Sequence, residues 1–392
     1  MSYHLSWLYL VSSPGFFMRR VFVLLTILLA VALTGCGSNT PRDDGSATRP
    51  EGSGGSASGP VGGGGFARNP AALRFANHMQ KQHGFDAKAV TAVLARAKRE
   101  SWIIEQMDKP VRKSRGPSAP TGAWKRYRAK FITDDNIDKG VAFWRQYAGE
   151  LKRASATYGV PPEIIVGIIG VETRWGRIMG KTRIIDALAT LSFAYPRRSE
   201  YFTGELESFF LMARDEGFDP LKPKGSFAGA MGYGQFMPSS IRKYAVDHNG
   251  DGHRNLWNPV DAIGSVANYF KGHGWRTGQP VAVRATASGS AAGSLKSGFD
   301  TRYSPGTLAR AGITPTGSLG GADQVSLLKL DVGGGYEYWL GLHNFYVITR
   351  YNHSTYYAMA VYQLGNAVKA RMGGTGGARV AQVLAPSVDL AL

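Results

Sequence analysis

The stretch VPPEIIVGIIGVETRWGRIMG, residues 160–180, places an acidic side chain, Glu172, at the end of the apolar run IIVGIIGV. The two prolines near its start suit a helix N-terminus, where a proline loses no hydrogen bond. On such a helix the residues three or four positions from Glu172 are apolar: Ile168, Ile169 and Trp175. An apolar wall raises the pKa of a carboxyl by desolvation and keeps it protonated, as a general acid must be.

The same stretch has a structural interpretation. A buried glutamate is also stable when a cation pairs with it, and Arg174 and Arg183 are close in the sequence. The heptapeptide GVETRWG, residues 170–176, does not choose between an acid catalyst and a structural ion pair.

Helical signals surround this stretch from residue 71 to 275. The pattern predicts helices in PAALRFANHMQKQHG, DAKAVTAVLARAKRE, IIDALATLSFAY, RSEYFTGELESFFLMARDEG, PSSIRKYAVDHN and NPVDAIGSVANYFKGHG. It also predicts one long helix in DDNIDKGVAFWRQYAGELKRASATYG, which begins with acidic residues and ends at Gly159. From Gln279 to Ile348 short alternating segments separated by turn residues replace this pattern: PVAVRATA, VSLLKLDV, GGGYEYWLGL and NFYVITRY. They predict a small β insert.

The N-terminus predicts a secreted lipoprotein. Two arginines precede the apolar segment VFVLLTILLAVAL, residues 21–33, which is too short to span a bilayer and is typical of a signal peptide. Leu-Thr-Gly-Cys follows and resembles a bacterial lipobox, whose cysteine, here Cys36, would be acylated; a plain signal peptide with an incidental cysteine is the alternative. No aspartate follows Cys36, which by resemblance favours the periplasmic side of the outer membrane. Translation could start at Met1 or at Met18.

The predicted organisation has six parts: a signal peptide (1–35), a Gly/Ser-rich flexible tether (36–70), a helical and catalytic region (71–278), a β-rich insert (279–348), a C-terminal helical segment (349–372) and a flexible tail (373–392). The chain is basic, with 46 Lys+Arg against 28 Asp+Glu and a formal charge of +18. That balance favours anionic partners such as acidic lipid or a wall polymer. We expect no nucleic acid partner, because no basic block stands out and a secreted lipoprotein would rarely meet one.

The stretch SFAGAMGYGQFMPSSI, residues 226–241, is rich in small residues around Tyr233 and Gln235. Small residues allow close backbone approach, so the segment could form a cleft wall with polar groups. A glycine-rich turn leading into a helix at Pro238 is the alternative.

The stretch DHNGDGHRNLWNPVD, residues 247–261, matches the first half of an EF-hand calcium loop. Positions one, three, five, six and seven of that loop correspond to Asp247, Asn249, Asp251, Gly252 and His253, the last through its backbone carbonyl. Position twelve is Asn258, and the next acid, Asp261, comes three residues late. The stretch is therefore either a lengthened calcium site closed by Asp261 or an Asn/Asp/Gly turn with Asp261 near a helix N-terminus.

Five motifs together resemble one family. GVETRWG, AYPRRSEYF, GAMGYGQFMPSS, the DxNxDGH loop and ITRYNHSTYYAMAVYQLG are similar, in the same order, to those of the membrane-bound lytic murein transglycosylase B family, over nearly all of residues 71–370. The resemblance implies a mainly α (α+β) fold, with a lysozyme-like helical core, a flanking helical domain and the small β insert. It implies non-hydrolytic cleavage of the β-1,4 bond between N-acetylmuramic acid and N-acetylglucosamine.

The resemblance also implies roles for individual residues. Glu172 would be the single acid/base, and the cleft would be lined by Ser226, Gln235, Tyr269, Tyr351 and Asn352. Arg197 and Arg198 would hold the peptide stem. The implied calcium ligands are Asp247, Asn249, Asp251, His253 and Asp261, with Asn249 a mild departure from the family. No organic cofactor is expected, and the expected partners are glycan strands, stem peptides, the membrane and wall-synthesis proteins.

A single carboxyl is chemically sufficient if the substrate supplies the nucleophile. Most glycosidases use two carboxylates, and no second acid stands out beside Glu172 in the sequence. Attack by the muramyl C6 hydroxyl on C1 would leave a 1,6-anhydro ring, and an intramolecular attack needs no activated water. Two rivals remain: a goose-type hydrolytic lysozyme and a non-catalytic peptidoglycan-binding lipoprotein.

Overall fold

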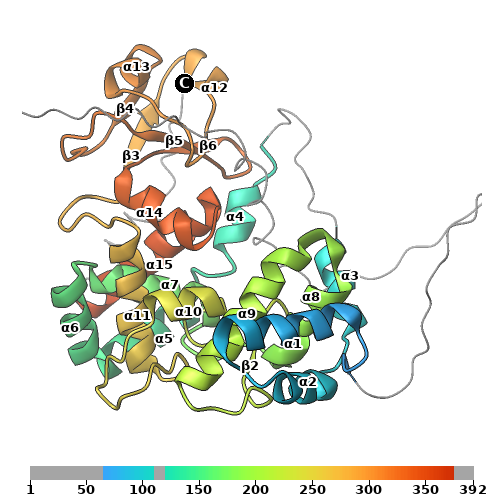
Figure 1. Ribbon diagram of the computed structural model, residues 1–392. Coiled ribbons are helices and arrows are strands. Elements are labelled where there is room, and N and C mark those ends of the chain that lie inside the picture. Colours follow the sequence, from blue (N-terminus) through green and yellow to red (C-terminus); the bar gives the residue numbers. More distant parts are fainter. Residues whose placement is uncertain (1–64, 110–119, 375–392) are drawn as a thin grey trace, which may run out of the picture.

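The computed structural model describes residues 65–109 and 120–374 (Figure 1). The signal peptide, Cys36, most of the predicted tether and the tail beyond residue 374 lie outside the described residues. The described α-helices are α1 (Pro70–His83), α2 (Ala87–Arg96), α3 (Ser101–Asp108), α4 (Ala123–Arg128), α5 (Asp134–Gln146), α6 (Ala148–Tyr158), α7 (Pro162–Thr173), α8 (Ile184–Ala194), α9 (Ser199–Asp215), α10 (Pro238–Tyr244), α11 (Pro259–Gly272), α12 (Ala291–Ser294), α13 (Pro305–Arg310), α14 (His343–Tyr351) and α15 (Thr355–Met372).

The strands form two antiparallel sheets. A two-stranded sheet pairs β1 (Thr182–Arg183) with β2 (Lys224–Gly225). The larger sheet has the order β4-β3-β6-β5, from β3 (Ala282–Ala287), β4 (Ile313–Pro315), β5 (Ser326–Asp331) and β6 (Tyr336–Gly341). The mainly helical fold with a small β insert is therefore confirmed.

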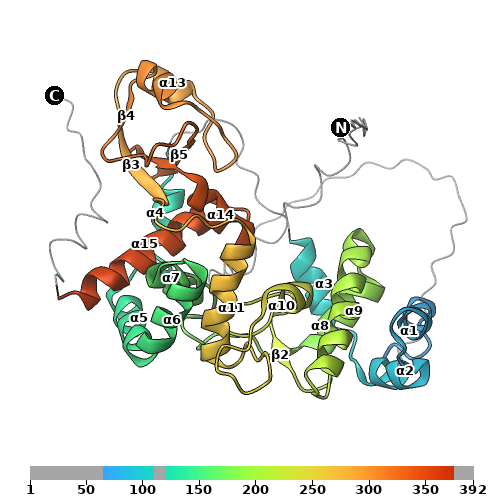
Figure 2. The ribbon, with the colours of Figure 1, turned by 60° about the vertical axis from the view of Figure 1, so that its left-hand side comes forward.

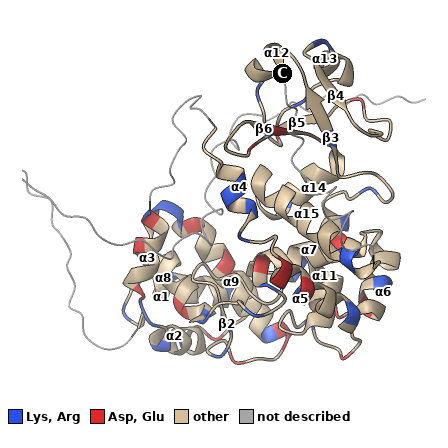
Figure 3. Cartoon of the chain, turned by 180° about the vertical axis from the view of Figure 1, so that it is seen from behind, with Lys and Arg blue, Asp and Glu red and all other residues tan. Residues whose placement is uncertain are grey.

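The elements form three groups in space (Figures 1 and 2). Helices α1, α2, α3, α8 and α9 make one side of the lower body, and α5, α6, α7, α10, α11 and α15 make the rest. The larger sheet, with α12 and α13, stands above α14 and α15. Acidic and basic residues are spread over all three groups (Figure 3).

Helix α7 lies at the centre of the core, and α15 packs along it. Residues Ile164 to Val171 are buried on every side of the helix, as the continuous apolar run predicts. Two glycines permit the close approach: a Cβ on Gly167 would lie 2.4 Å from the carbonyl oxygen of Val361, and one on Gly365 1.9 Å from that of Glu163. This packing brings the N-terminal end of α15 to the end of α7 that carries Glu172.

The β insert is fastened to the body through α4. The carboxylate of Asp331, at the end of β5, accepts hydrogen bonds from the backbone N–H groups of Thr121, Gly122 and Ala123, at the start of α4. Buried Glu337 on β6 pairs with Arg128 of α4 at 3.7 Å. These contacts fix α4, whose Tyr127 lines the main cavity.

Two local predictions are wrong. The predicted helix over residues 134–159 is broken at Tyr147, whose backbone leaves the helical region (φ −113°, ψ 30°); α5 packs against α15, whereas α6 packs against α11. The segment NFYVITRY is not a strand but most of α14, although its β-branched and aromatic residues favour a strand. Its buried residues include Phe345, Ile348 and Thr349, with a helical spacing, so packing decides its structure.

No single described helix is long and apolar enough to cross a membrane, and the bent pair of α6 and α7 meets the length and composition criteria only jointly.

Candidate active site

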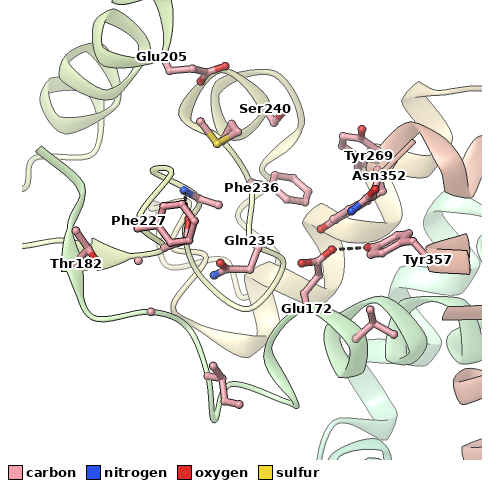
Figure 4. A pocket seen from close by; sticks show the side chains of 18 of the residues that line it. Glu172, Thr182, Glu205, Phe227, Gln235, Phe236, Ser240, Tyr269, Asn352 and Tyr357 are labelled. Carbon is pink, nitrogen blue, oxygen red and sulfur yellow. Dashed lines mark hydrogen bonds between the residues drawn. The ribbon is translucent and has the colours of Figure 1, made fainter. Parts of the chain in front are cut away.

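A cavity of about 780 Å³ opens between the helical groups (Figure 4). Helices α3, α4, α9 and α11, the C-terminal end of α7, the loop before α10 and the segment from α14 to α15 contribute to its wall. The structure brings six of the eight predicted catalytic and substrate-binding residues together in this wall: Glu172, Ser226, Gln235, Tyr269, Tyr351 and Asn352.

Glu172 lies in the last turn of α7 and faces the cavity. Burial raises the pKa of its carboxyl to about 7, and a hydrogen bond from Tyr357 opposes this rise in part. The carboxyl is therefore protonated over much of the range below neutral pH, as the apolar surroundings of the sequence stretch predict.

The ion-pair interpretation of Glu172 is not what the geometry shows. Arg183 forms a bidentate ion pair with Asp186 instead, at 2.7 and 2.8 Å, and Arg174 donates to the backbone carbonyl of Lys130. The expected helical neighbour Trp175 is also placed differently. Helix α7 ends at Thr173, and Trp175 has a left-handed backbone (φ 54°) that turns its ring back against the helix near Gly170.

Tyr357, near the start of α15, donates its hydroxyl hydrogen bond to Oε1 of Glu172. The Ser354 side chain caps this helix by accepting from the backbone N–H of Tyr357. Burial and the charge of Glu172 raise the pKa of the Tyr357 hydroxyl well above its ordinary value, so the tyrosine stays a donor. These two residues are 185 positions apart in the chain, and no local pattern signals the pair.

Gln235 sits on a tight hairpin in which the backbones of Met231 and Phe236 pair. Its backbone is left-handed (φ 50°), a strained conformation for a residue with a side chain. Its amide nitrogen donates to the backbone carbonyl of Gly232 at 2.9 Å. This fixes the amide plane, and the side chain lies between Glu172 and the opposite wall (Figure 4).

An aromatic cluster forms the wall beside Glu172. The Tyr351 ring lies 4.8 Å from that of Tyr269 and is nearly parallel to that of Tyr357 at 6.5 Å. The Tyr351 hydroxyl donates to the carbonyl of Gly234 at 2.5 Å, and that of Tyr269 donates to the carbonyl of Arg350 at 2.7 Å. Both hydroxyls are therefore engaged by the protein, and the rings form a rigid surface.

Ser226 and Asn352 place polar groups on this cavity. The Ser226 hydroxyl accepts from the backbone N–H of Ala230 at 2.9 Å. The buried Oδ1 of Asn352 has no hydrogen-bond partner within the described part of the chain. A buried unpaired amide oxygen is costly, so a ligand that donates to it would be favoured.

A second carboxyl, that of Glu205 on α9, also lines the cavity, which the sequence did not reveal. It lies at the opposite end of the view in Figure 4 from Glu172. Its Oε2 accepts from the backbone N–H of Ser239 at 2.9 Å and its Oε1 accepts from the hydroxyl of the same residue at 2.7 Å. Burial raises the pKa of Glu205, and these bonds oppose the rise. Both oxygens are thus committed to holding the start of α10.

The two predicted stem-peptide residues lie outside the cavity wall. Arg197 is exposed and pairs with Asp108 at 2.9 Å. The guanidinium of Arg198 lies 4.4 Å from the centre of the Tyr201 ring. Tyr201 lines the cavity, so Arg198 contacts a residue of the cavity wall without lining the cavity itself.

The segment 247–261 brings its acidic residues together. Ligand oxygens of Asp247, Asp251 and Asp261 all lie within 4.8 Å of one another. Asn258 is not the closing ligand, because its side chain caps α11 by accepting from the backbone N–H of Val260. Buried Asp261, in the first turn of α11, reaches back and accepts from the backbone N–H groups of the loop. The loop therefore gathers three carboxylates next to a capped helix start.

Asn249 and His253 complete the loop in different ways. The Asn249 amide donates to the Asp251 carboxylate at 2.7 Å. The His253 imidazole points toward Glu216 at 3.9 Å, which leaves its backbone carbonyl as its possible ligand atom. The same loop supports the hairpin that carries Gln235, because the carbonyl of Leu256 accepts from the backbone N–H of Tyr233 at 2.9 Å.

Several other cavity residues were not singled out from the sequence. They are aromatic or polar side chains from separate elements: Trp102, Tyr127, Tyr201, Phe227, Ser239, Ser240 and Arg350. Such residues resemble ordinary core or surface positions, and only the packing of distant segments assigns them to one wall.

Comparison with known proteins gives consistent matches. Residues 67–366 match the Transglycosylase SLT domain family. The chain is 65% identical over 302 residues to membrane-bound lytic murein transglycosylase B of Escherichia coli (strain K12), which covers 76% of this chain and 83% of the relative. The structures of the E. coli lytic transglycosylase SLT35 with bulgecin A and with calcium each match with a TM-score of 0.75 and 63% identity, over 79% of this chain and 96% of the other.

A more distant structure, SltB3 from Pseudomonas aeruginosa with NAG-anhNAM-pentapeptide, has a TM-score of 0.65 and 30% identity, over 76% of this chain and 78% of the other. The resemblance drawn from the five motifs is confirmed, and the chain belongs to the membrane-bound lytic murein transglycosylase B family, whose members cleave peptidoglycan as lyases.

Proposed function

We propose that this lytic murein transglycosylase works through one carboxyl group, that of Glu172. The observation that supports this most is the contrast between the two carboxyls of the cavity. The pKa of Glu172 is raised to about 7 by burial, and its Oε2 is not held by the protein within the described residues. Both oxygens of Glu205 are occupied by Ser239. Only Glu172 is therefore free to exchange a proton with a substrate.

The reaction then needs two proton transfers at the same carboxyl. Glu172 first protonates the glycosidic oxygen between N-acetylmuramic acid and N-acetylglucosamine, and the C1–O bond breaks. The resulting carboxylate takes the proton of the muramyl C6 hydroxyl as that oxygen bonds to C1. The products are a 1,6-anhydromuramic end and a free C4 hydroxyl, and the carboxyl is protonated again. Water is not consumed.

The cavity wall supplies groups to position the glycan. The rigid faces of Tyr269 and Tyr351 suit the apolar faces of sugar rings. The unpaired Oδ1 of Asn352 accepts, and the Ser226 hydroxyl can donate while it accepts from Ala230. Gln235 is held by its amide nitrogen, so its carbonyl oxygen is left for the substrate. Solved relatives in complex with NAG-NAM-pentapeptide and NAG-anhNAM-pentapeptide support a peptidoglycan ligand.

We assign the stem peptide to the side of the cavity near Arg197 and Arg198. Both residues directly precede α9, and the Arg198 guanidinium lies over Tyr201 of the cavity wall, so an acidic peptide attached to the muramyl lactyl group would meet positive charge there.

The loop at 247–261 fits a calcium ion in a structural role. Three carboxylates approach within 4.8 Å, and none of them forms an ion pair with a cationic side chain among the described residues. An all-oxygen set of this kind suits calcium. The ligands would be Asp247, Asn249, Asp251, Asp261 and the carbonyl of His253, and a related structure contains calcium. The ion would stabilise the loop that supports Tyr233.

Acylation of Cys36 would anchor the enzyme on the periplasmic side of the outer membrane. The lipobox and the tether after it motivate this assignment, and a membrane-bound relative supports it. The variant Cys36→Ser should be found either in the soluble fraction or as an unprocessed precursor when membranes are separated and extracted with detergent. A mature form of Cys36→Ser that stays in the membrane would contradict lipid anchoring.

Product analysis in oxygen-labelled water tests the reaction. Sacculi digested with the purified enzyme should give muropeptides with 1,6-anhydromuramic ends and no solvent oxygen, by mass spectrometry. Labelled reducing ends would instead identify a hydrolytic lysozyme. No soluble product at all would favour a binding protein.

A further inference from the structure

A cluster of two histidines and one glutamate lies on the side of the molecule away from the sheet, between α1 and α9. Nε2 of His78 lies 3.2 Å from Oε2 of Glu207, and Nε2 of His83 lies 2.7 Å from Oε1 of the same carboxylate. The ligand atoms of all three residues fall within 4.8 Å of one another. None of the three lines the main cavity.

We propose that His78, His83 and Glu207 bind a zinc ion that links α1 to α9. Two imidazole nitrogens and one carboxylate are a frequent protein ligand set for zinc, with a solvent molecule as the fourth ligand. Two tetrahedral ligands at about 2.05 Å from the metal lie about 3.3 Å apart. His78 and His83 lie 3.2 and 2.7 Å from different oxygens of Glu207, so a carboxylate that binds through both oxygens needs only a small outward movement of the imidazoles.

The cluster has the access that such a site needs. The side chains of His78, His83 and Glu207 are 47%, 25% and 28% exposed, so an ion can enter and a water can complete the coordination. The set contains imidazoles, which zinc accepts and calcium does not favour, so it is chemically distinct from the all-oxygen loop at 247–261.

The surrounding helices already hold the ligands in place. Helix α1 is capped by Asn69 at its start and ends at left-handed Gly84, directly after His83. Its apolar face packs on α9 of the same helical group, where Phe75 contacts Phe210 with ring centres 5.8 Å apart. The ligands are thus brought together by packing before an ion binds, which lowers the entropy cost of binding.

The orientation of Glu207 on α9 places the proposed zinc site outside the cavity that contains Glu172. Each residue of an α-helix turns the side chain by about 100°, so Glu205 and Glu207 project in nearly opposite directions from α9. Glu205 faces the cavity and Glu207 faces α1. Zinc would therefore stabilise the packing of the first described helix, which follows the predicted tether, without entering the cavity.

The test uses the full chain in detergent, stripped with a chelator and reloaded with excess calcium. Zinc chloride is then titrated by calorimetry and by thermal unfolding. We expect one equivalent of zinc to bind and the melting temperature to rise, because an ion that binds only the folded state stabilises it. The variants His78→Gln and Glu207→Gln should each weaken zinc binding by more than about tenfold, whereas the control His343→Gln, which removes an imidazole elsewhere, should bind zinc as the wild type does.

Cobalt substitution provides a readout that does not depend on stability. Cobalt bound at this site should give the visible absorption of a tetrahedral nitrogen and oxygen environment, and the His78→Gln variant should lose it. The proposal is overturned if the wild type binds no zinc, or if the His78→Gln and Glu207→Gln variants keep the zinc shift.

Discussion

The end of α7 and the loop at 247–261 both use carboxyl groups, but the protein treats them in opposite ways. Glu172 lies at the end of an apolar helix, and among the described residues its carboxyl has one hydrogen-bond donor, Tyr357. Burial raises its pKa to about 7. Asp251 is exposed in the loop, and hydrogen bonds from Asn249 and from the backbone N–H of His253 lower its pKa.

The comparison shows that surroundings, more than residue type, decide what an acidic side chain does. Desolvation with few donors keeps a proton on a carboxyl, whereas solvent and several donors remove it. The first arrangement suits proton transfer and the second suits a cation. Four experiments test this contrast.

The largest expected effect is on turnover. Replacement Glu172→Gln keeps the shape of the side chain but removes the transferable proton, and general acid–base catalysis alone contributes roughly 10²- to 10⁴-fold. Because one group serves both steps, we expect turnover of sacculi to fall to the assay floor while binding of glycan fragments persists. The matched variant Glu205→Gln, in the same cavity, should keep measurable turnover. If the Glu172→Gln variant remains active, the single-carboxyl proposal is wrong.

The second effect is on stability against pH. The folded state holds the Glu172 proton up to about pH 7, whereas an unfolded glutamate releases it near its ordinary value of 4.5. Between these values the folded state binds more protons, so this group's contribution to stability is lost as the pH rises. The Glu172→Gln variant does not titrate, so its unfolding free energy relative to the wild type should rise by up to about 3 kcal/mol from pH 4.5 to pH 8. Denaturant unfolding at pH 4.5 and pH 8 measures this. If the difference in unfolding free energy between the variant and the wild type is the same at both pH values, the pKa of Glu172 is not raised in the folded state.

The third effect concerns the loop. Calcium at about one hundred times its dissociation constant should add about 2.7 kcal/mol to the unfolding free energy, seen as a rise in melting temperature. Asp251→Ala should abolish this rise, and Glu207→Gln, far from the loop, should keep it. If calcium does not change the melting temperature of the wild type, the loop is an Asn/Asp/Gly turn and not a calcium site.

The smallest expected effect comes from Tyr357→Phe. The lost hydrogen bond favours the charged form of Glu172, so its removal should raise the pKa of Glu172 further. The alkaline limb of the pH–activity profile should move to higher pH. A limb that stays in place would mean that the Tyr357 hydroxyl does not tune the acid.

Much of the fold could be predicted from the chain itself. The apolar run before Glu172 indicated a buried helix with an acid at its end, and α7 has that form. Gly159 marked the end of α6 and the two prolines after it marked the start of α7, and the alternating segments of 279–348 marked three of the four strands of the larger sheet. These features are local because periodicity and caps depend on neighbouring residues. NFYVITRY was assigned wrongly because its strand propensity is local, whereas the packing that makes it helical is not.

Five ordered motifs in the chain indicate the family, and the apolar neighbours of Glu172 made a protonated carboxyl one of two interpretations. The surroundings of that carboxyl, which exclude the ion pair, depend on the tertiary structure. It brought Tyr357 to Glu172 across 185 positions, committed Glu205 to Ser239, and turned Trp175 back against α7. The reason is that desolvation and hydrogen bonding depend on distances in space, which a chain acquires only when α15 packs on α7 and α9 meets α10.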